Sequence, residues 1–557
     1  MRRIVVIAAG MPGISCAARI KHLLPDCELN LVLPAPLPDQ EPEGDRSNGD
    51  KATEQSDYEA LRPYGISAME ARDIMPDLPQ REITLSADRG RLTIRYTDLV
   101  VEAPAAVRLP HALQRVENVF AWPLPERNAP AAALHAALLA SGEKNRAVIV
   151  TGNGLPALEA VCFVRQAGLK ALWLRTGENA PDVEPHLLAL ILKRLGRDVA
   201  CIPLPGVASG QLVCSLDGAG RRLERISPPG GDPADVSACL WTAPLMARHP
   251  LLREDGVTLD AFGRIDTVAE AAGLNLRFIG SGAAVPPALL AGGAVRAPVY
   301  PGGDEAAALS AALAVAGLRD SGDGGPFLPQ GALRARALRS PDMFLACGGF
   351  TLAEAQALGR NAEQAVVSLF LPDSQAEASR LVLALIGDGK SRAPLGAQVL
   401  CLGRDSAAAE GLFAMALAAL ADGTRIETLM QRAWSGLPAG MLGNAAGVLA
   451  DKWDTVVQGI TPDEFLASRH AGAEFFTLDL RARAQWAGGC LPDAYNIPLP
   501  QLKKRLQDEV PRFTPLVLVC ATGDEARATA VGLAAMGATD LYALDGGMDL
   551  WPYSLNQ

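Results

Sequence analysis

A single cysteine near the end of the chain stands where residue types and spacing favour sulfur chemistry. The apolar run 516–519 predicts a strand, which leads directly into Cys520 and a short glycine-containing loop before a helical pattern begins. A thiol at such a place meets backbone N–H groups and the positive end of a helix dipole, and both favour the thiolate. The alternative is a half-buried structural cysteine at a strand end. We therefore take Cys520 as the candidate catalytic residue, with a sulfur-carrier loop of Thr522, Gly523, Asp524, Glu525 and Arg527.

Residues 455–557 resemble a rhodanese domain. The resemblance rests on the Cys520 loop, on Asp-Leu-Arg at 479–481, on residues 489–498, and on a closing Gly-Gly-x-x-x-Trp at 546–551. Rhodanese loops usually read Cys-x-x-Gly-x-Arg-Ser, whereas Glu525 stands at the Arg position and Arg527 lies two positions later. An anion at the place of a cation should raise the thiol pKa and repel thiosulfate. We therefore expect sulfur transfer through Cys520, with thiosulfate as a poor donor.

Two strand–glycine turn–helix units stand further upstream, one at the start of the chain and one after residue 145. The first turn contains Gly10 and Gly13, and the second contains Gly152 and Gly154. Glycines in such a turn let a pyrophosphate approach a helix N-terminus closely. A lone turn of this kind is weak evidence, but two of them, with a further strand at 276–279, form a more specific arrangement.

The whole chain thereby resembles the pyridine nucleotide-disulfide oxidoreductases, in the coenzyme A disulfide reductase and NADH persulfide reductase branch that carries a C-terminal rhodanese domain. The fold class implied is α/β, with two Rossmann-like domains, an α+β interface domain and the rhodanese domain. The expected boundaries are 1–120 plus 245–320 for the FAD-type domain, 121–244 for the NAD(P)-type domain, 321–450 for the interface domain and 455–557 for the rhodanese domain. The interface domain implies a homodimer.

The resemblance implies FAD at the first unit, held by Gly10, Gly13, Gly280 and Ser281. Three expected contacts are altered. Strand two ends at 33–34 in Leu-Pro without an acidic side chain for the ribose, residues 102–104 read Glu-Ala-Pro where Ala-Thr-Gly is usual, and Ser281 replaces an Asp. Each loss costs on the order of 1–3 kcal/mol if a buried polar group of the cofactor is left unpaired. We therefore expect weakened FAD binding.

The redox cysteine that the family places in the first domain is also missing. No cysteine lies between residues 34 and 64, and the nearest analogue of the family's Asn-Cys pair is Ser47-Asn48. Cys16 and Cys27 are expected to pack in the core. Reduction of a disulfide through a first-domain cysteine is therefore not supported.

The second unit keeps the nicotinamide pattern better. The residues that match it are Gly152, Gly154, Ala157 and Glu159, and Arg175 ends the following strand where an NAD-binding protein carries an acid. A cation there suits a 2′-phosphate, so we expect NAD(P)H with a preference for NADPH. The alternative is an ordinary βα turn that has lost its ligand, with Arg175 simply solvated.

Composition bounds the remaining possibilities. The 557 residues carry a net charge of −11 without a basic cluster, which argues against nucleic acid and anionic membranes as partners. The ten cysteines are scattered without metal-ligand spacing, so we expect no metal site, and a reducing cytoplasm fits best. No segment reaches the roughly 18 apolar residues of a membrane helix.

Two functions remain open. The first is an NAD(P)H-dependent FAD enzyme acting on a small-molecule thiol, persulfide or CoA-linked disulfide, with Cys520 delivering sulfur. The second is a catalytically reduced homologue that serves as a nucleotide-binding or regulatory scaffold, with only Cys520 competent. The whole-chain architecture favours the first, and the coincident changes at the FAD contacts and the redox cysteine favour the second.

Overall fold

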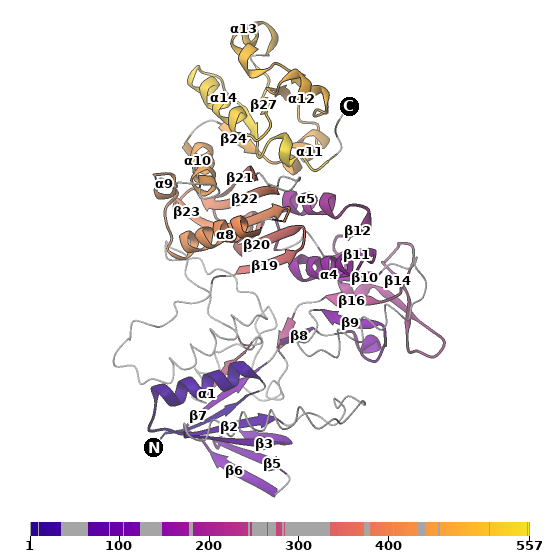
Figure 1. The fold of residues 1–557 in the computed structure, drawn as a ribbon, viewed down its shortest axis with the longest axis vertical. Coiled ribbons are helices and arrows are strands. Elements are labelled where there is room, and N and C mark those ends of the chain that lie inside the picture. Colours follow the sequence, from indigo (N-terminus) through magenta and orange to yellow (C-terminus); the bar gives the residue numbers. More distant parts are fainter. Residues whose placement is uncertain are drawn as a thin grey trace. The chain divides into compact units, whose positions relative to one another are not determined.

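The computed structural model describes residues 2–34, 65–122, 148–247, 265, 275–283 and 333–555, apart from short gaps at 9, 88–89, 104, 108, 178–181, 243–244, 281–282, 334, 372–378, 405, 432–439, 455–456, 512 and 554. The described residues fall into two compact units (Figure 1). The first unit takes those within 1–108 and 244–288, and the second takes those within 109–243 and 333–557.

The first unit is built on a five-stranded parallel sheet. Its strands, in spatial order, are β18 (Leu276–Ile279), β7 (Asp98–Glu102), β1 (Arg3–Ile7), β2 (Glu28–Pro34) and β3 (Ile66–Ala71). Helix α1 (Met11–Leu23) covers one face of this sheet, and its buried residues pack with Ile4, Val6 and Val100. The other face packs against a three-stranded antiparallel sheet of β4 (Asp73–Asp77), β5 (Glu82–Ala87) and β6 (Gly90–Arg95). Strands β8 (Ala105–Val107) and β17 (Leu245–Ala247) pair separately.

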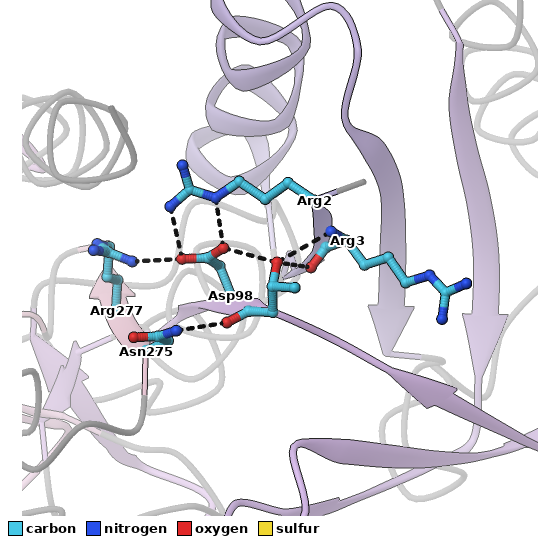
Figure 2. A network of polar contacts seen from close by, with 6 residues as sticks. Arg2, Arg3, Asp98, Asn275 and Arg277 are labelled. Atoms are coloured by element: carbon cyan, nitrogen blue, oxygen red, sulfur yellow. Dashed lines mark hydrogen bonds and ion pairs between the residues drawn. The ribbon is translucent and has the colours of Figure 1, made fainter. Parts of the chain in front are cut away.

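A polar network fixes the amino ends of β1, β7 and β18. The carboxylate of Asp98 lies between the guanidinium groups of Arg2 and Arg277 (Figure 2). The distances are 2.8 Å to Arg2 and 3.3 Å to Arg277. The Thr97 hydroxyl donates to Asp98 and accepts from the backbone N–H of Arg3. The Asn275 side chain donates to the carbonyl of Thr97. The same parallel register brings the carboxyl ends of these strands together at the opposite edge of the sheet.

The second unit begins with another five-stranded parallel sheet. Its strands are β12 (Val199–Leu204), β11 (Ala171–Thr176), β10 (Val148–Gly152), β16 (Cys239–Thr242) and β9 (Val119–Trp122). The flanking helices are α4 (Gly154–Gln166) and α5 (Pro185–Leu195), and a small antiparallel sheet holds β13 (Val213–Leu216), β14 (Leu223–Ser227) and β15 (Ala234–Asp235). Strand β10 is buried throughout, as expected for the central strand of a sheet covered on both faces.

An antiparallel sheet with helices follows in the second unit. Its strands are β19 (Ala335–Ser340), β20 (Met343–Gly349), β23 (Ala393–Leu402), β22 (Ser379–Asp388) and β21 (Ala362–Leu371). The helices are α7 (Leu352–Ala357), α8 (Ser406–Ala421), α9 (Ile426–Gln431) and α10 (Gly440–Asp454). The apolar sides of α8 and α10 form one large core with this sheet.

The C-terminal domain is a parallel five-stranded sheet with helices on both faces (Figure 1). Its strands are β24 (Val457–Ile460), β28 (Leu541–Leu544), β27 (Leu516–Val519), β25 (Phe476–Asp479) and β26 (Tyr495–Asn496). The helices are α11 (Pro462–His470), α12 (Arg483–Ala487), α13 (Leu499–Glu509) and α14 (Asp524–Ala535). Helix α11 starts at a capping box in which Thr461 and Glu464 satisfy each other's backbone N–H groups.

Candidate active site

Cys520 lies at the carboxyl end of the central strand β27, in a loop that wraps around its sulfur. The Sγ atom accepts hydrogen bonds from the backbone N–H groups of Gly523 at 3.1 Å and Ala526 at 3.4 Å. Gly523 has a φ of +93°, which lets the loop turn back over the sulfur before α14 begins. The expected cradle of N–H groups at a helix N-terminus is therefore present.

The protonation of Cys520 differs from the expectation. Burial raises the pKa of the thiol, while the backbone N–H groups of Ala526, Gly523, Thr522 and Glu525 lower it, and the net result is a raised pKa. The sequence led us to expect that the N–H groups favour the thiolate and that Glu525 raises the pKa. The N–H groups do lower the pKa, but burial outweighs them, and this burial depends on tertiary packing that sequence does not reveal. The N–H groups offset part of the cost of forming a buried thiolate.

The other residues of the predicted carrier loop lie in different places. Glu525 is exposed, and burial of the sulfur, not the Glu525 carboxylate, is the main cause of the raised Cys520 pKa. Thr522 and Asp524 form a side-chain hydrogen bond of 3.2 Å. Arg527 turns toward α10, where its guanidinium donates to Asp451 at 3.0 Å and to Asn444 at 3.1 Å. The structure thus brings Thr522, Gly523 and the backbone of Glu525 to the sulfur and ties Arg527 elsewhere.

The Gly546-Gly547 segment holds the Cys520 loop in place. Backbone N–H groups of Met548 and Asp549 donate to the carbonyls of Cys520 and Ala521, each at 2.9 Å. Gly547 has a φ of +62°, and a Cβ atom there would lie 2.4 Å from the Ala521 carbonyl oxygen. A glycine is required because both the backbone conformation and the space exclude a side chain.

A buried ion pair anchors this segment to the preceding domain, and sequence reasoning missed it. Lys452 of α10 lies 2.6 Å from the carboxylate of Asp545, and it also donates to the carbonyl of Gln364. Burial raises the pKa of Asp545, and the charge of Lys452 opposes that effect. The residues are 93 positions apart, so no local pattern could have indicated their contact.

The Asp-Leu-Arg motif lies at the carboxyl end of β25, the strand next to β27. Asp479 is fully buried, and Arg481 binds it with distances of 2.7 Å and 3.1 Å while donating to the carbonyl of Gly489. The Asn496 side chain donates to the carbonyls of both motif residues. These contacts hold the segment that follows β25, and β25 is the neighbour of the strand that leads into Cys520.

The first glycine turn, at the start of α1, is filled by a side chain of the same unit. The carboxylate of Glu102, at the end of β7, accepts from the N–H groups of Gly10 at 2.9 Å and Gly13 at 3.0 Å. Gly280 lies beside it, since a Cβ atom there would be 2.9 Å from the Ala103 carbonyl oxygen. Ser281 and the Ser47-Asn48 pair lie outside the described residues. An anionic pyrophosphate does not fit the turn while this carboxylate holds its N–H groups.

The second turn, between β10 and α4, keeps its glycine geometry. Gly152 and Gly154 have φ values of +110° and +72°, and Ala157 is buried on α4. The N–H group of Gly154 donates to the Asn153 side chain at 2.8 Å, and that of Leu155 donates to Asp182 at 3.2 Å. A phosphate at this turn therefore requires the Asp182 carboxylate to move.

Glu159 and Arg175 were also predicted for the second turn. Glu159 binds a residue elsewhere, and Arg175 lies beside the turn. Glu159 forms an ion pair of 2.8 Å with Arg336 of β19. Arg175 lies near the end of β11, next to Gly152 in the register of the two strands, and its side chain is partly exposed.

The described residues include neither a membrane-spanning helix nor a cluster of metal-binding side chains. No helix among them is long and apolar enough to cross a membrane. Within the same residues, no group of three or more His, Cys, Asp and Glu side chains is arranged to hold a metal ion. All ten cysteines lie among the described residues, and no two of them form a disulfide bond.

Comparison with known proteins identifies the C-terminal domain. Residues 461–552 match the family model of the rhodanese-like domain. The uncharacterized protein YqhL of Bacillus subtilis (strain 168) is 31% identical over 96 residues, which are 17% of this chain and 73% of that protein. The thiosulfate sulfurtransferase GlpE of Pseudomonas syringae is 29% identical over 97 residues, 17% of this chain and 89% of that enzyme. This part of the chain belongs to the rhodanese-like family.

The fold of the whole chain is similar to the folds of solved proteins. Reduced CoADR-RHD from Bacillus anthracis superposes with a TM-score of 0.76 at 18% identity, covering 99% of this chain and 97% of that one. The NAD-dependent persulfide reductase from A. fulgidus gives a TM-score of 0.74 at 17% identity, covering 99% of this chain and all of that one. The fold is therefore that of a pyridine nucleotide-disulfide oxidoreductase with a C-terminal rhodanese domain, which confirms the predicted fold class and branch.

Proposed function

We propose that the chain transfers sulfane sulfur through Cys520, within a disulfide or persulfide reductase-like protein. The observation that carries this proposal is the pair of backbone N–H groups, from Gly523 and Ala526, that donate to the Cys520 sulfur. Donors fixed around a sulfur stabilise negative charge on it and need no rearrangement during the reaction. A structural cysteine has no need of such a cradle.

The transfer balances without an added oxidant or reductant. The Cys520 thiolate attacks the outer sulfur of a donor persulfide, so a bond from Sγ to that sulfur forms as the donor's S–S bond breaks. The donor leaves as a thiolate, and Cys520 becomes a persulfide. An acceptor thiolate or cyanide then attacks the outer sulfur, Cys520 leaves as a thiolate, and the persulfide proton passes to solvent.

We propose a persulfide of a small-molecule thiol as donor, in preference to thiosulfate. The exposed carboxylates of Asp524 and Glu525 flank the first turn of α14 and disfavour a dianion near the sulfur. The name of the A. fulgidus neighbour, a persulfide reductase, agrees with this choice of substrate class.

Cyanide-coupled turnover on the full chain tests the proposal. The wild type should form thiocyanate from a small persulfide, Cys520→Ser should abolish it, and Cys490→Ser, which removes a partly exposed thiol of the same domain, should not. Because the Cys520 pKa is raised from 9.0, the rate should keep rising as the pH approaches and passes 9. Undiminished turnover by Cys520→Ser would refute the assignment.

We also propose a nicotinamide dinucleotide as ligand of the second turn. Two solved proteins of similar fold bind these groups: a water-forming NADH oxidase from Lactobacillus brevis is bound to NADH, and its engineered variant is bound to NADPH. The glycine geometry at Gly152 and Gly154 supports such a ligand, and Arg175 supports NADPH. When bound, the nicotinamide would supply hydride chemistry, while this chain's turn and Arg175 would bind and orient its phosphates. We further propose a cytoplasmic homodimer that associates through the domain containing α8 and α10.

A further inference from the structure

The carboxylate of Glu102 occupies the position at which this class of sheet binds a dinucleotide pyrophosphate. In the first unit, β2 lies on one side of β1 and β7 on the other, so the topological switch point falls between β1 and β7. Ligands of open α/β sheets bind outside the carboxyl ends of the strands at that point, with phosphate on the N-terminus of the first helix. Ile7 pairs with Val101, so Glu102 is the next residue along at this same edge.

The contacts of Glu102 are those that a phosphate would make. One carboxylate oxygen accepts from Gly10 at 2.9 Å and from Gly13 at 3.0 Å, which are N–H groups of the first turn of α1 left without helical partners. The side chain is 6% exposed, and a Cβ atom on Gly13 would lie 2.5 Å from that same oxygen. A negative charge, two hydrogen bonds and close packing all favour the carboxylate at this place.

We propose that Glu102 is an internal competitor for the anion position of the first turn and keeps a dinucleotide pyrophosphate out of it. A pyrophosphate at this turn would meet both the volume and the negative charge of the carboxylate. FAD can take its ordinary place only after the Glu102 side chain leaves the N–H groups. The FAD expected from the family resemblance therefore does not fit this turn as it stands.

The second unit independently contains a related contact. The carboxylate of Asp182, which is 8% exposed, accepts from the Leu155 N–H group at the start of α4, and a Cβ atom on Gly154 would lie 2.5 Å from the same oxygen. The distance from the Leu155 nitrogen to this oxygen is 3.2 Å, longer than the two distances at Glu102, and the Asp182 side chain comes from a loop and not from a strand end. We infer weaker competition here, so a nucleotide displaces Asp182 more readily than Glu102.

The test compares ligand binding by the full-length wild type, Glu102→Ala, Glu102→Gln and a matched control. Glu28→Gln is the control, because Glu28 begins β2 at the opposite end of the same sheet and its side chain forms an exposed ion pair with Arg3. The probes are FAD, measured by ultrafiltration and absorbance, and inorganic pyrophosphate, measured by the shift in melting temperature. Glu102→Ala should bind FAD at least about tenfold more tightly than the wild type, a difference of ~1.4 kcal/mol.

Inorganic pyrophosphate should stabilise Glu102→Ala more than the wild type or Glu28→Gln, because the freed N–H groups can donate hydrogen bonds to the added anion. The stabilisation of Glu102→Gln by pyrophosphate should lie between those of the wild type and Glu102→Ala, because Gln keeps the shape of the side chain but loses its charge. Equal FAD affinity and equal pyrophosphate response in all four proteins would overturn the proposal. So would a wild type that purifies with one tightly bound FAD per chain, a result that decides the matter even if the variants do not fold. Neither outcome bears on sulfur transfer by Cys520.

Discussion

Lys452 and Asp545 form an ion pair of 2.6 Å whose side chains are 8% and 5% exposed. The pair joins α10 to the residue that directly precedes Gly546-Gly547, and the next residues, Met548 and Asp549, bind the carbonyls of the Cys520 loop. A charge in one domain thus supports the backbone that shapes the sulfur site in another. The rhodanese-like domain is therefore linked to the preceding domain by side-chain contacts as well as by the polypeptide chain.

Removing the lysine should destabilise the protein strongly. Lys452→Met leaves the Asp545 carboxylate buried without a partner, and loss of one member of a buried pair costs about 3–5 kcal/mol. Urea unfolding followed by fluorescence should show this loss, while Lys503→Met, which removes an exposed lysine of α13, should change little. The double variant Lys452→Met with Asp545→Leu should recover part of the stability. A Lys452→Met protein as stable as the wild type would contradict this role.

Acid should weaken the first unit through Asp98. Burial alone raises the pKa of this carboxyl, but hydrogen bonds from Arg2 and Thr97 and the charges of Arg2 and Arg277 outweigh it and lower the pKa from 3.8. A depressed pKa contributes stability that is present above the unfolded value and is lost as the pH falls through the folded value. Asp98→Asn should therefore reduce stability at neutral pH and flatten its fall below about pH 4, as measured by urea unfolding at a series of pH values. Parallel profiles for the two proteins would show that Asp98 is not the group responsible.

Reversing the charge of Glu525 should improve thiosulfate as a donor. Its backbone N–H group already helps to hold the Cys520 sulfur, so an Arg side chain there would place a cation near an incoming dianion. We expect Glu525→Arg to raise kcat/KM for thiosulfate by about tenfold, equivalent to ~1.4 kcal/mol in the barrier. Glu474→Arg makes the same charge change at another exposed position of the domain and should have a smaller effect. Equal rates in wild type and Glu525→Arg would remove the electrostatic explanation and leave the carrier role intact.

Nucleotide preference should depend on Arg175. If a nicotinamide dinucleotide binds at the second turn, the guanidinium should favour the 2′-phosphate of NADPH, and Arg175→Glu should favour NADH instead. Titration calorimetry on the full chain measures both affinities. Arg197→Glu, which changes an exposed arginine near the end of α5, serves as the control. Equal affinity of the wild type for NADPH and NADH, or binding of neither, would refute the assignment.

The motifs and the family resemblance predicted the fold class correctly, and local patterns predicted the backbone arrangement around Cys520. The apolar run before Cys520, the glycine after it and the closing Gly-Gly segment are close in sequence or are determined by backbone conformation, so their arrangement could be inferred. The sequence also showed that Glu102 departs from the residue usual in the family. It did not show which groups the Glu102 side chain contacts. Its bond to Gly10 spans 92 residues and depends on strand order and register.

The other differences between the sequence-based predictions and the structure also arise from contacts between residues that are distant in sequence. The raised pKa of Cys520 follows from burial by side chains of several elements, and the pairing of Arg527 with Asp451 spans 76 residues. Glu159 fits a nucleotide pattern in sequence, yet its ion pair with Arg336 links α4 to β19. Each of these outcomes is set by tertiary packing, which no pattern of neighbouring residues specifies.

The mass of the protein after reaction with a sulfur donor tests the central claim most directly. The full chain should be incubated with a small persulfide, freed of excess donor and measured by intact and peptide mass spectrometry. The account predicts a gain of one sulfur atom, localised to the peptide that contains Cys520, reversed by cyanide and lost in Cys520→Ser but not in Cys490→Ser. A wild-type protein that gains no sulfur, or a Cys520→Ser variant that gains as much as the wild type, would contradict the assignment of Cys520 as the carrier.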